Sequence, residues 1–202
     1  MDAVSTTGCW QCGAETAGAL ACPLCGTAQR LAGDADLFAV LGLPRRLTVD
    51  AADLERRYVE AARAVHPDRH QTSGSAARAA SLGASTGVNR AYRTLRDPVV
   101  RARYWLELHG TRLAENGARV PPEIAAEVFE TQEKLAELRA GGPVRDELVT
   151  LREALGARLA DLRSELEARF GDEPSLEELR RRLAEIAYLQ TLHGDVDEAL
   201  GD

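Results

Sequence analysis

The sequence predicts a mainly α-helical protein in which a small cysteine-rich domain precedes two helical domains. Apolar residues recur at helical spacing through most of the chain after residue 36, and Pro or Gly stands at the ends of these stretches. No stretch shows sustained alternation of apolar and polar residues, and β-branched residues are sparse. All four cysteines lie within the first 25 residues. Together these observations predict a tetracysteine segment, a helical domain and a C-terminal three-helix bundle.

The composition is that of an ordinary soluble protein. Of 202 residues, 45% are hydrophobic and 28% charged, and aromatic residues make up only 4%, so the core is expected to be mostly Leu, Val and Ala. No apolar run approaches the roughly 18–20 residues that a membrane span requires. The N-terminus has neither the basic region nor the apolar core of a secretory signal. We therefore expect a cytoplasmic protein that has no membrane partner and in which disulfides would be unusual.

The net charge of −7 is unevenly distributed. Residues 1–110 carry 13 Arg, no Lys and 11 acidic residues, whereas the remainder carries 12 basic and 21 acidic residues. This asymmetry suggests that the two halves have different partners. Because nucleic-acid binding depends on neutralising phosphates, the acidic C-terminal half argues against a nucleic-acid partner.

The cysteines form two Cys-x-x-Cys-Gly knuckles, at residues 9–13 and 22–26. Gly tolerates the backbone conformation that aims two thiolates at one point. Two knuckles supply four thiolates, which is the ligand set of a closed structural zinc site. We predict a zinc-binding tetracysteine domain over residues 1–30, folded largely by its metal. The predicted ligands are Cys9, Cys12, Cys22 and Cys25.

Other readings of these cysteines are weaker. Iron held by four thiolates stays open, since sulfur ligands suit both metals. A redox Cys-x-x-Cys should follow a strand and open a helix, and nothing here does so. A zinc ion held by four thiolates has no open position, so we expect no catalysis from it.

The middle of the chain is organised around His66-Pro67-Asp68. Residues 50–65 read as a helix that has Asp50 as N-cap and one apolar stripe, and Pro67 cannot continue it. Residues 71–75 read as a loop, and a second long helix is expected over residues 81–96, with a ragged start because Ser-, Gly- and Ala-rich sequence continues through Gly87. Shorter helices are expected at residues 36–41 and 98–108.

Two antiparallel helices with His-Pro-Asp in the intervening loop resemble the J-domain of DnaJ-type co-chaperones, here over residues 35–110. The resemblance implies that the loop and the basic face of the preceding helix engage a DnaK-type ATPase chaperone and stimulate its ATP hydrolysis. Arg side chains would supply steering and charged hydrogen bonds to an acidic groove. The implied chaperone-binding residues are His66, Pro67, Asp68, Arg56, Arg57 and Arg63.

Residues 120–202 predict three antiparallel helices. Pro122 opens the first, and Gly141-Gly142 ends it. Leucines at heptad spacing from Leu148 to Leu166 mark the second. Ser175 and Glu178 form a capping box for the third. An intermolecular coiled coil is an alternative, but the short seams and the Gly and Pro breaks favour packing within the chain.

A J-domain followed directly by a three-helix bundle resembles the HscB family, J-type co-chaperones of iron–sulfur cluster assembly, and the four-cysteine extension matches its zinc-binding variants. The resemblance implies a protein that binds an IscU-like cluster scaffold and presents it to a DnaK/HscA-type chaperone. The implied scaffold-binding residues are Phe129, Glu133, Lys134, Glu137 and Tyr188.

Some features depart from the family or leave alternatives open. Glu130 and Glu133 stand where the family often has apolar residues, so the scaffold patch is more polar here. A J-protein adaptor for a different client is therefore the alternative function. Trp10, Leu20 and Leu24 are candidates either for the interface of a possible homodimer or for covering the neighbouring domain. We expect no intrinsic enzyme activity, because the sequence offers no nucleophile–base pair, no phosphate-binding loop and no open metal site.

Overall fold

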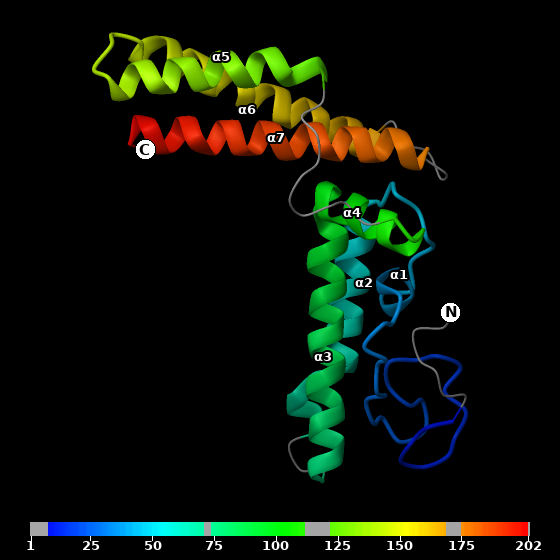
Figure 1. The fold of residues 1–202 in the computed structure, drawn as a ribbon. Coiled ribbons are helices and arrows are strands. Elements are labelled where there is room, and N and C mark those ends of the chain that lie inside the picture. The colour runs from blue at the N-terminus through cyan, green and yellow to red at the C-terminus, as the bar shows by residue number, and fades with distance from the viewer. Residues whose placement is uncertain (1–7, 71–73, 112–121, 169–174, 202) are drawn as a thin grey trace. The chain divides into compact units, whose positions relative to one another are not determined.

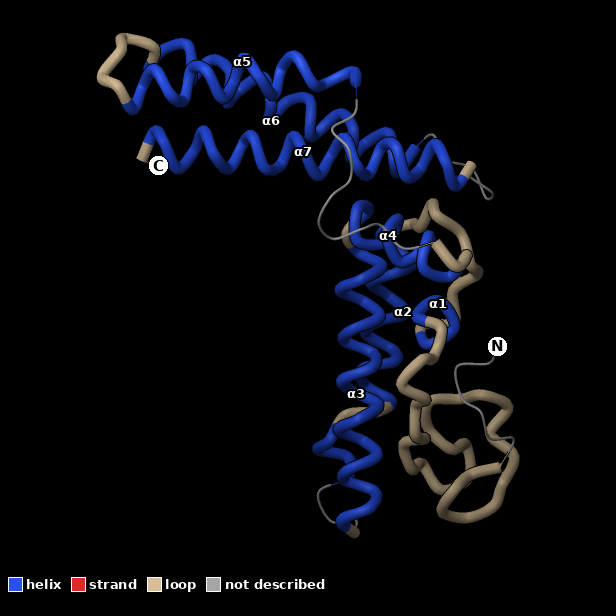
Figure 2. The backbone as a smooth tube through the Cα atoms, in the orientation of Figure 1, coloured by secondary structure: helices blue, strands red, loops and turns tan. Residues whose placement is uncertain are grey.

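The computed structural model describes residues 8–70, 74–111, 122–168 and 175–201 (Figure 1). The described chain is mainly helical, as predicted, and its β pairing is limited to two isolated antiparallel bridges (Figure 2). The chain forms two compact units, residues 1–101 and 102–202, and each is treated by itself. This division does not test the predicted domain boundaries at 1–30, 35–110 and 120–202, which stay predictions.

Residues 8–35 form an irregular module of turns. The bridges Gly8↔Glu15 and Ala21↔Ala28 close its two knuckles. In each knuckle the glycine lies in the left-handed region, with φ +76° at Gly13 and +71° at Gly26, where a side chain would be strained. The module buries few apolar side chains beyond two of its cysteines, so hydrophobic burial contributes little to its folding.

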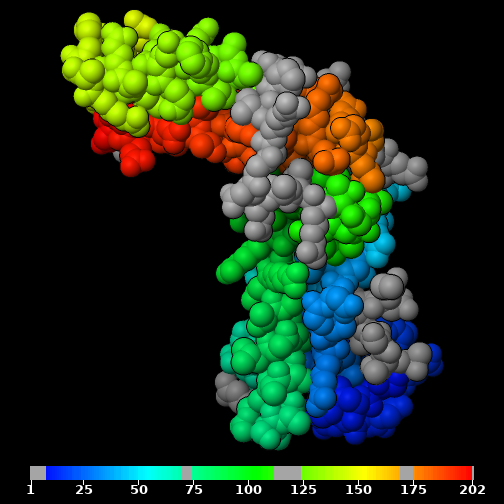
Figure 3. Space-filling view, in the orientation of Figure 1, coloured from blue at the N-terminus to red at the C-terminus, as the bar shows by residue number. Residues whose placement is uncertain are grey.

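The module is followed by a linker that packs on the long helix α3 (Ser75–Arg96). A Cβ atom at Gly87 would lie 2.6 Å from Leu31 Cδ1, so Leu31 occupies the space that the glycine leaves. Arg90 also donates to the Gly33 carbonyl at 3.4 Å. In the space-filling view the module, in blue, lies against the N-terminal half of α3 (Figure 3).

Four further elements complete the first half of the chain: α1 (Leu37–Val40), α2 (Ala51–Ala64), the short 3₁₀ helix η1 (Pro67–His70) and α4 (Pro98–Leu108). Helices α2 and α3 run antiparallel, and α1 packs on α3 (Figure 1). Asp50 caps α2 by accepting from the Asp53 N–H at 2.7 Å, as the sequence predicts. The predicted starts and ends of α1, α2 and α4 are confirmed to within two residues.

The predicted start of α3 is wrong. The helix begins at Ser75, not at residue 81, and therefore includes the Ser- and Ala-rich residues between these two positions. Alanine is the best helix former, and Ala77, Ala80 and Ala84 are buried. Their packing outweighs the cost of about 1 kcal/mol for an interior glycine such as Gly83.

The second unit contains a bundle of α5 (Pro122–Arg139), α6 (Arg145–Ala168) and α7 (Leu176–Leu200). Ser175 caps α7 by accepting from the Glu178 N–H at 3.4 Å. Helix α7 extends to Leu200 because Val196 and Leu200 in its last turns are buried in the bundle core. The buried positions of α6 and α7 include Leu148, Leu155, Leu162, Leu166, Leu179, Leu183, Ile186 and Leu189.

No helix among the described residues combines the length and the apolar character that crossing a bilayer would take.

Candidate functional sites

The His-Pro-Asp turn lies where α2 ends and η1 begins. The His66 and Asp68 side chains are 55% and 72% exposed, and their Nδ1 and Oδ2 atoms are 3.6 Å apart. The Asp68 N–H also donates to His66 Nδ1 at 3.3 Å. Below the turn, the buried Ser81 hydroxyl donates to the Val65 carbonyl at 2.7 Å, so α3 holds the chain in place just before the turn. Ser81 is a positioning residue that the sequence reading missed.

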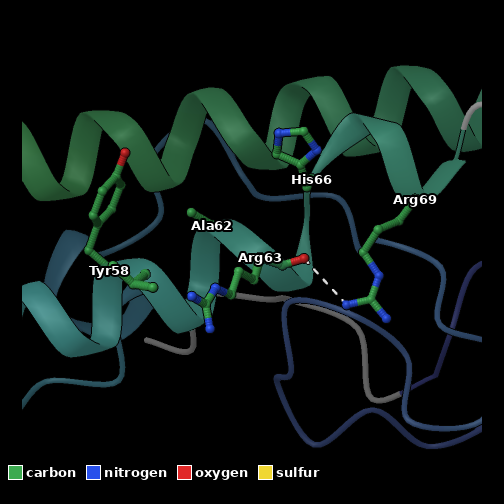
Figure 4. A pocket seen from close by; sticks show the side chains of 6 residues that line it. Tyr58, Ala62, Arg63, His66 and Arg69 are labelled. Atoms are coloured by element: carbon green, nitrogen blue, oxygen red, sulfur yellow. Dashed lines mark hydrogen bonds between the residues drawn. The ribbon is translucent and has the colours of Figure 1, made fainter.

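A shallow groove beside the turn has an apolar floor and a basic rim (Figure 4). Its lining residues are Tyr58, Val59, Ala62, Arg63, His66 and Arg69. The Arg69 guanidinium donates to the backbone carbonyl of Arg63 at 3.4 Å, which holds the Arg69 side chain against the end of α2. Arg69 is absent from the predicted site, although its place directly after the tripeptide could have suggested it.

The predicted basic face divides into two parts. Arg56 and Arg57 both pair with Asp53 on their own helix, and Arg57 Nε lies 2.8 Å from the carboxylate. Arg57 also donates to the Gly42 carbonyl, which ties α2 to the turn after α1. The hydrogen bond from Arg57, reinforced by Arg56, lowers the pKa of Asp53. Only Arg63 of the three predicted arginines lines the groove beside His66.

The four cysteines come together as a group suited to a metal ion. Their Sγ atoms all lie within 4.8 Å of one another. The Cys9–Cys25 and Cys12–Cys22 sulfur pairs are each 3.7 Å apart. A tetrahedron with metal–sulfur bonds of about 2.3 Å has edges of about 3.8 Å, so this arrangement fits a four-thiolate site. Cys9 and Cys22 are buried, whereas Cys12 and Cys25 lie at the surface.

The thiols of this group cannot ionise independently. Burial raises the pKa of Cys9, but backbone N–H groups of the first knuckle and the Gln29 amide stabilise the thiolate and lower that pKa to about 6. At Cys12 a backbone hydrogen bond from Ala14 lowers the pKa of the thiol. Burial and the neighbouring sulfurs outweigh it and raise that pKa to about 12. Cys9 therefore ionises easily, whereas Cys12 stays protonated because a second thiolate would repel the first. A bound cation removes this repulsion between the thiolates.

The predicted scaffold patch is centred on α5. Phe129 is 64% exposed, an unusual state for a large aromatic side chain. Glu133 and Glu137 follow at intervals of four residues, are exposed, and lie on the same face of the helix as Phe129. These three residues form a row along α5 that has the aromatic side chain at its N-terminal end and two carboxylates after it.

The other two predicted residues lie differently. Lys134 is about 140° around α5 from Phe129 and pairs with Glu147 of α6. Tyr188 is half-buried on α7. Tyr188 and Phe129 lie at about the same position along the bundle axis, because α5 and α7 are joined by side-chain contacts before and after these two residues. Arg158 of α6 binds both Glu127 of α5 and Glu185 of α7, and Gln132 of α5 donates to Asp195 of α7.

Comparison with known proteins agrees with this architecture. Residues 36–104 match the DnaJ domain family, and residues 120–197 match the HSCB C-terminal oligomerisation domain family. A co-chaperone protein HscB homolog from Chromobacterium violaceum is 40% identical over 134 residues, which cover 66% of this chain and 75% of that protein. The chain belongs to the HscB family of co-chaperones. A second HscB homolog, from Azoarcus sp., is 35% identical and aligns with 82% of this chain and 93% of its own length.

Solved HscB structures extend the match. The crystal structure of human co-chaperone protein HscB aligns with 95% of this chain and 97% of its own, at a TM-score of 0.72 and 28% identity. Chaperone HscB from Vibrio cholerae aligns with 81% of this chain and 96% of its own, at a TM-score of 0.59. At 22% identity the Vibrio protein shows only the shared fold.

Proposed function

We propose that this protein is a co-chaperone of iron–sulfur cluster assembly that binds a cluster scaffold and presents it to a DnaK/HscA-type chaperone. The observation that carries the proposal is an exposed His-Pro-Asp turn on a DnaJ domain, joined in one chain to an HSCB-type bundle with an exposed aromatic residue. Its relatives bear the name co-chaperone, so the proposed activity is stimulation of the chaperone's ATP hydrolysis rather than catalysis by this chain.

The chaperone-binding surface is proposed to be the turn together with the basic-rimmed groove. His66, Pro67 and Asp68 would insert at the chaperone, and Arg63 and Arg69 would meet acidic side chains. Arg56 and Arg57 stay in the proposed surface at its edge, where their pairing with Asp53 leaves less positive charge available.

The test is steady-state ATP hydrolysis by a DnaK-type chaperone, with this protein and an IscU-like scaffold added separately and together. We expect synergy between the two that His66→Gln abolishes. His193→Gln is the matched control, because His193 lies in the bundle and pairs with Asp197. Stimulation that does not depend on the scaffold would indicate an adaptor for a different client. No stimulation of any chaperone would overturn the proposal.

The scaffold-binding surface is proposed to include Phe129, Glu133, Lys134, Glu137 and Tyr188. Phe129→Ala should weaken scaffold binding at least tenfold, as expected for an aromatic residue at the centre of an interface. Leu82→Ala is the matched control, since Leu82 is 62% exposed but lies on α3. Equal loss in both variants would overturn the assignment.

Lys134 provides a direct footprint, because it is the only lysine in the chain. An amine-reactive label that distinguishes the ε-amine from the N-terminus should modify Lys134 more slowly when scaffold is bound. If labelling is unchanged while Phe129→Ala still weakens binding, Lys134 lies outside the interface.

The four-cysteine group is proposed to hold structural zinc. Its sulfur spacing fits a tetrahedral four-thiolate site, and the module has little apolar core to fold without one. Elemental analysis and colour separate the alternatives, since ferric thiolate is red and zinc thiolate is colourless.

Cytoplasmic localisation and a possible homodimer stay predictions. Analytical ultracentrifugation would test the homodimer.

A further inference from the structure

Gln29 is buried against a sulfur atom of the metal site. Its side chain is 0% exposed, and its Nε2 atom lies 3.4 Å from Cys9 Sγ and 2.7 Å from the Thr27 carbonyl oxygen. A side-chain NH₂ group has two hydrogens, and here each faces one acceptor. No Cys-x-x-Cys pattern includes this residue, so the sequence by itself offers no signal for it.

The orientation of the amide follows from these neighbours. Both groups next to Nε2 are hydrogen-bond acceptors, whereas Oε1 is buried and has no hydrogen-bond partner among the described residues. Rotating the amide would place its carbonyl oxygen against a sulfur and a second carbonyl, which are repulsive contacts. The cost of leaving Oε1 without a hydrogen bond must be offset by the two hydrogen bonds that Nε2 donates.

Gln29 also connects the two knuckles. Its backbone N–H donates to the Leu20 carbonyl at 2.8 Å, and the Thr27 carbonyl that accepts from Nε2 also accepts from the Cys22 N–H at 2.9 Å. The Thr27 hydroxyl lies 3.4 Å from Cys25 Sγ. One buried side chain therefore reaches a ligand of the first knuckle and the turn that carries the ligands of the second.

We infer that Gln29 is a positioning residue of the tetracysteine metal site, which orients Cys9 and stabilises its thiolate by donating a hydrogen bond to it. A divalent cation with four thiolates carries excess negative charge, so N–H donors to the sulfurs strengthen the site. The backbone N–H of Gln11 donates to the same sulfur at 3.4 Å, and Gln29 adds the side-chain contribution. The inference rests on the metal site proposed above.

The test compares Gln29→Met with Gln11→Met in the full-length chain. Methionine has nearly the length of glutamine but cannot donate a hydrogen bond. Gln11 is the matched control, because its exposed side chain contacts Thr27 and no sulfur, and its backbone N–H survives the substitution. Zinc affinity is measured by chelator competition, and the sulfur-to-metal charge-transfer band is recorded after Co²⁺ substitution.

We expect Gln29→Met to weaken zinc binding about 10- to 100-fold and to move the Co²⁺ band to lower energy, because the sulfur electrons lose a stabilising donor. Gln11→Met removes only an acceptor of the Thr27 hydroxyl, one step away from a sulfur, so it should change both much less than Gln29→Met does. Weaker zinc binding with an unmoved Co²⁺ band would mean that Gln29 only helps the module to fold, and would overturn its role at the sulfur. Unchanged zinc affinity together with an unmoved band would overturn that role as well. A wild-type chain that binds neither metal would overturn the site itself.

Discussion

The tetracysteine module and the three-helix bundle obtain their folding stability from different interactions. The bundle buries a continuous set of Leu, Ile and Val side chains between its helices. The module instead buries two cysteines and Ala28 together with the polar side chains Thr16, Thr27 and Gln29. Because about 25 cal/mol is gained per Å² of buried apolar surface, burial can stabilise the bundle but not a segment this small and polar.

The two parts of the chain should therefore respond to different perturbations. The module should depend on its metal and on the protonation of its thiols. The bundle should depend on core volume and hardly at all on metal.

Cys22→Ser should have the largest effect and be confined to the module. Loss of one of four thiolates removes most of a binding free energy that is about 10–16 kcal/mol for structural zinc. Zinc content should fall and amide protons of residues 8–35 should lose protection from exchange, while those of α6 and α7 keep theirs. Loss of protection in the bundle would contradict the separation.

Acidification should also affect the module first. Within the coupled thiol group the pKa of Cys9 is lowered to about 6 from 9.0, so the stability that its ionisation contributes is present above pH 9 and is lost as the pH falls through 6, whereas the raised pKa of Cys12 acts in the opposite direction. A bound cation competes with protons, so the metal-loaded module should persist to lower pH. Far-UV circular dichroism of the helices should change little between pH 8 and 5. Equal acid sensitivity with and without metal would contradict the prediction.

Leu183→Ala should destabilise the bundle by about 2–5 kcal/mol without changing zinc affinity. Leu183 is fully buried on α7, and truncation leaves a cavity among the neighbouring leucines. Urea unfolding followed by circular dichroism measures the loss. Leu82→Ala on an exposed face of α3 should change stability by less than about 0.5 kcal/mol, and a comparable loss there would contradict the assignment of the core.

Arg158→Met should have the smallest effect, about 1 kcal/mol. Arg158 joins Glu127 and Glu185 across three helices, but its side chain is 37% exposed, so solvent screens the pairs. The difference between wild type and variant should shrink at 1 M salt. A loss as large as that of Leu183→Ala would mean that charge, not apolar burial, holds the bundle together.

Most helix boundaries could be predicted from the sequence because they depend on neighbouring residues. Asp50 and Ser175 accept hydrogen bonds from N–H groups three residues away, and Pro98 and Pro122 open helices by their own geometry. The start of α3 could not, since no side chain caps it and its first turns are stabilised by the burial of Ala77 and Ala80.

The candidate sites also contain both features that local sequence patterns predict and contacts that they do not predict. Each Cys-x-x-Cys-Gly knuckle and the His-Pro-Asp turn are local patterns, and both appear where the sequence predicts them. The pairing of Arg57 with Gly42 and of Lys134 with Glu147 joins residues more than ten positions apart. No local pattern indicated that these side chains were engaged.

Spacing, caps and turn residues act over a few positions, so the mainly helical fold, the four-cysteine group and the family resemblance could be read from the chain before folding. Which polar groups meet across the chain depends on the folded structure. Gln29 reaches Cys9 over 20 positions, and the Ser81 hydroxyl holds the Val65 carbonyl over 16. The energy of such contacts depends on burial and geometry, which exist only once the chain has folded.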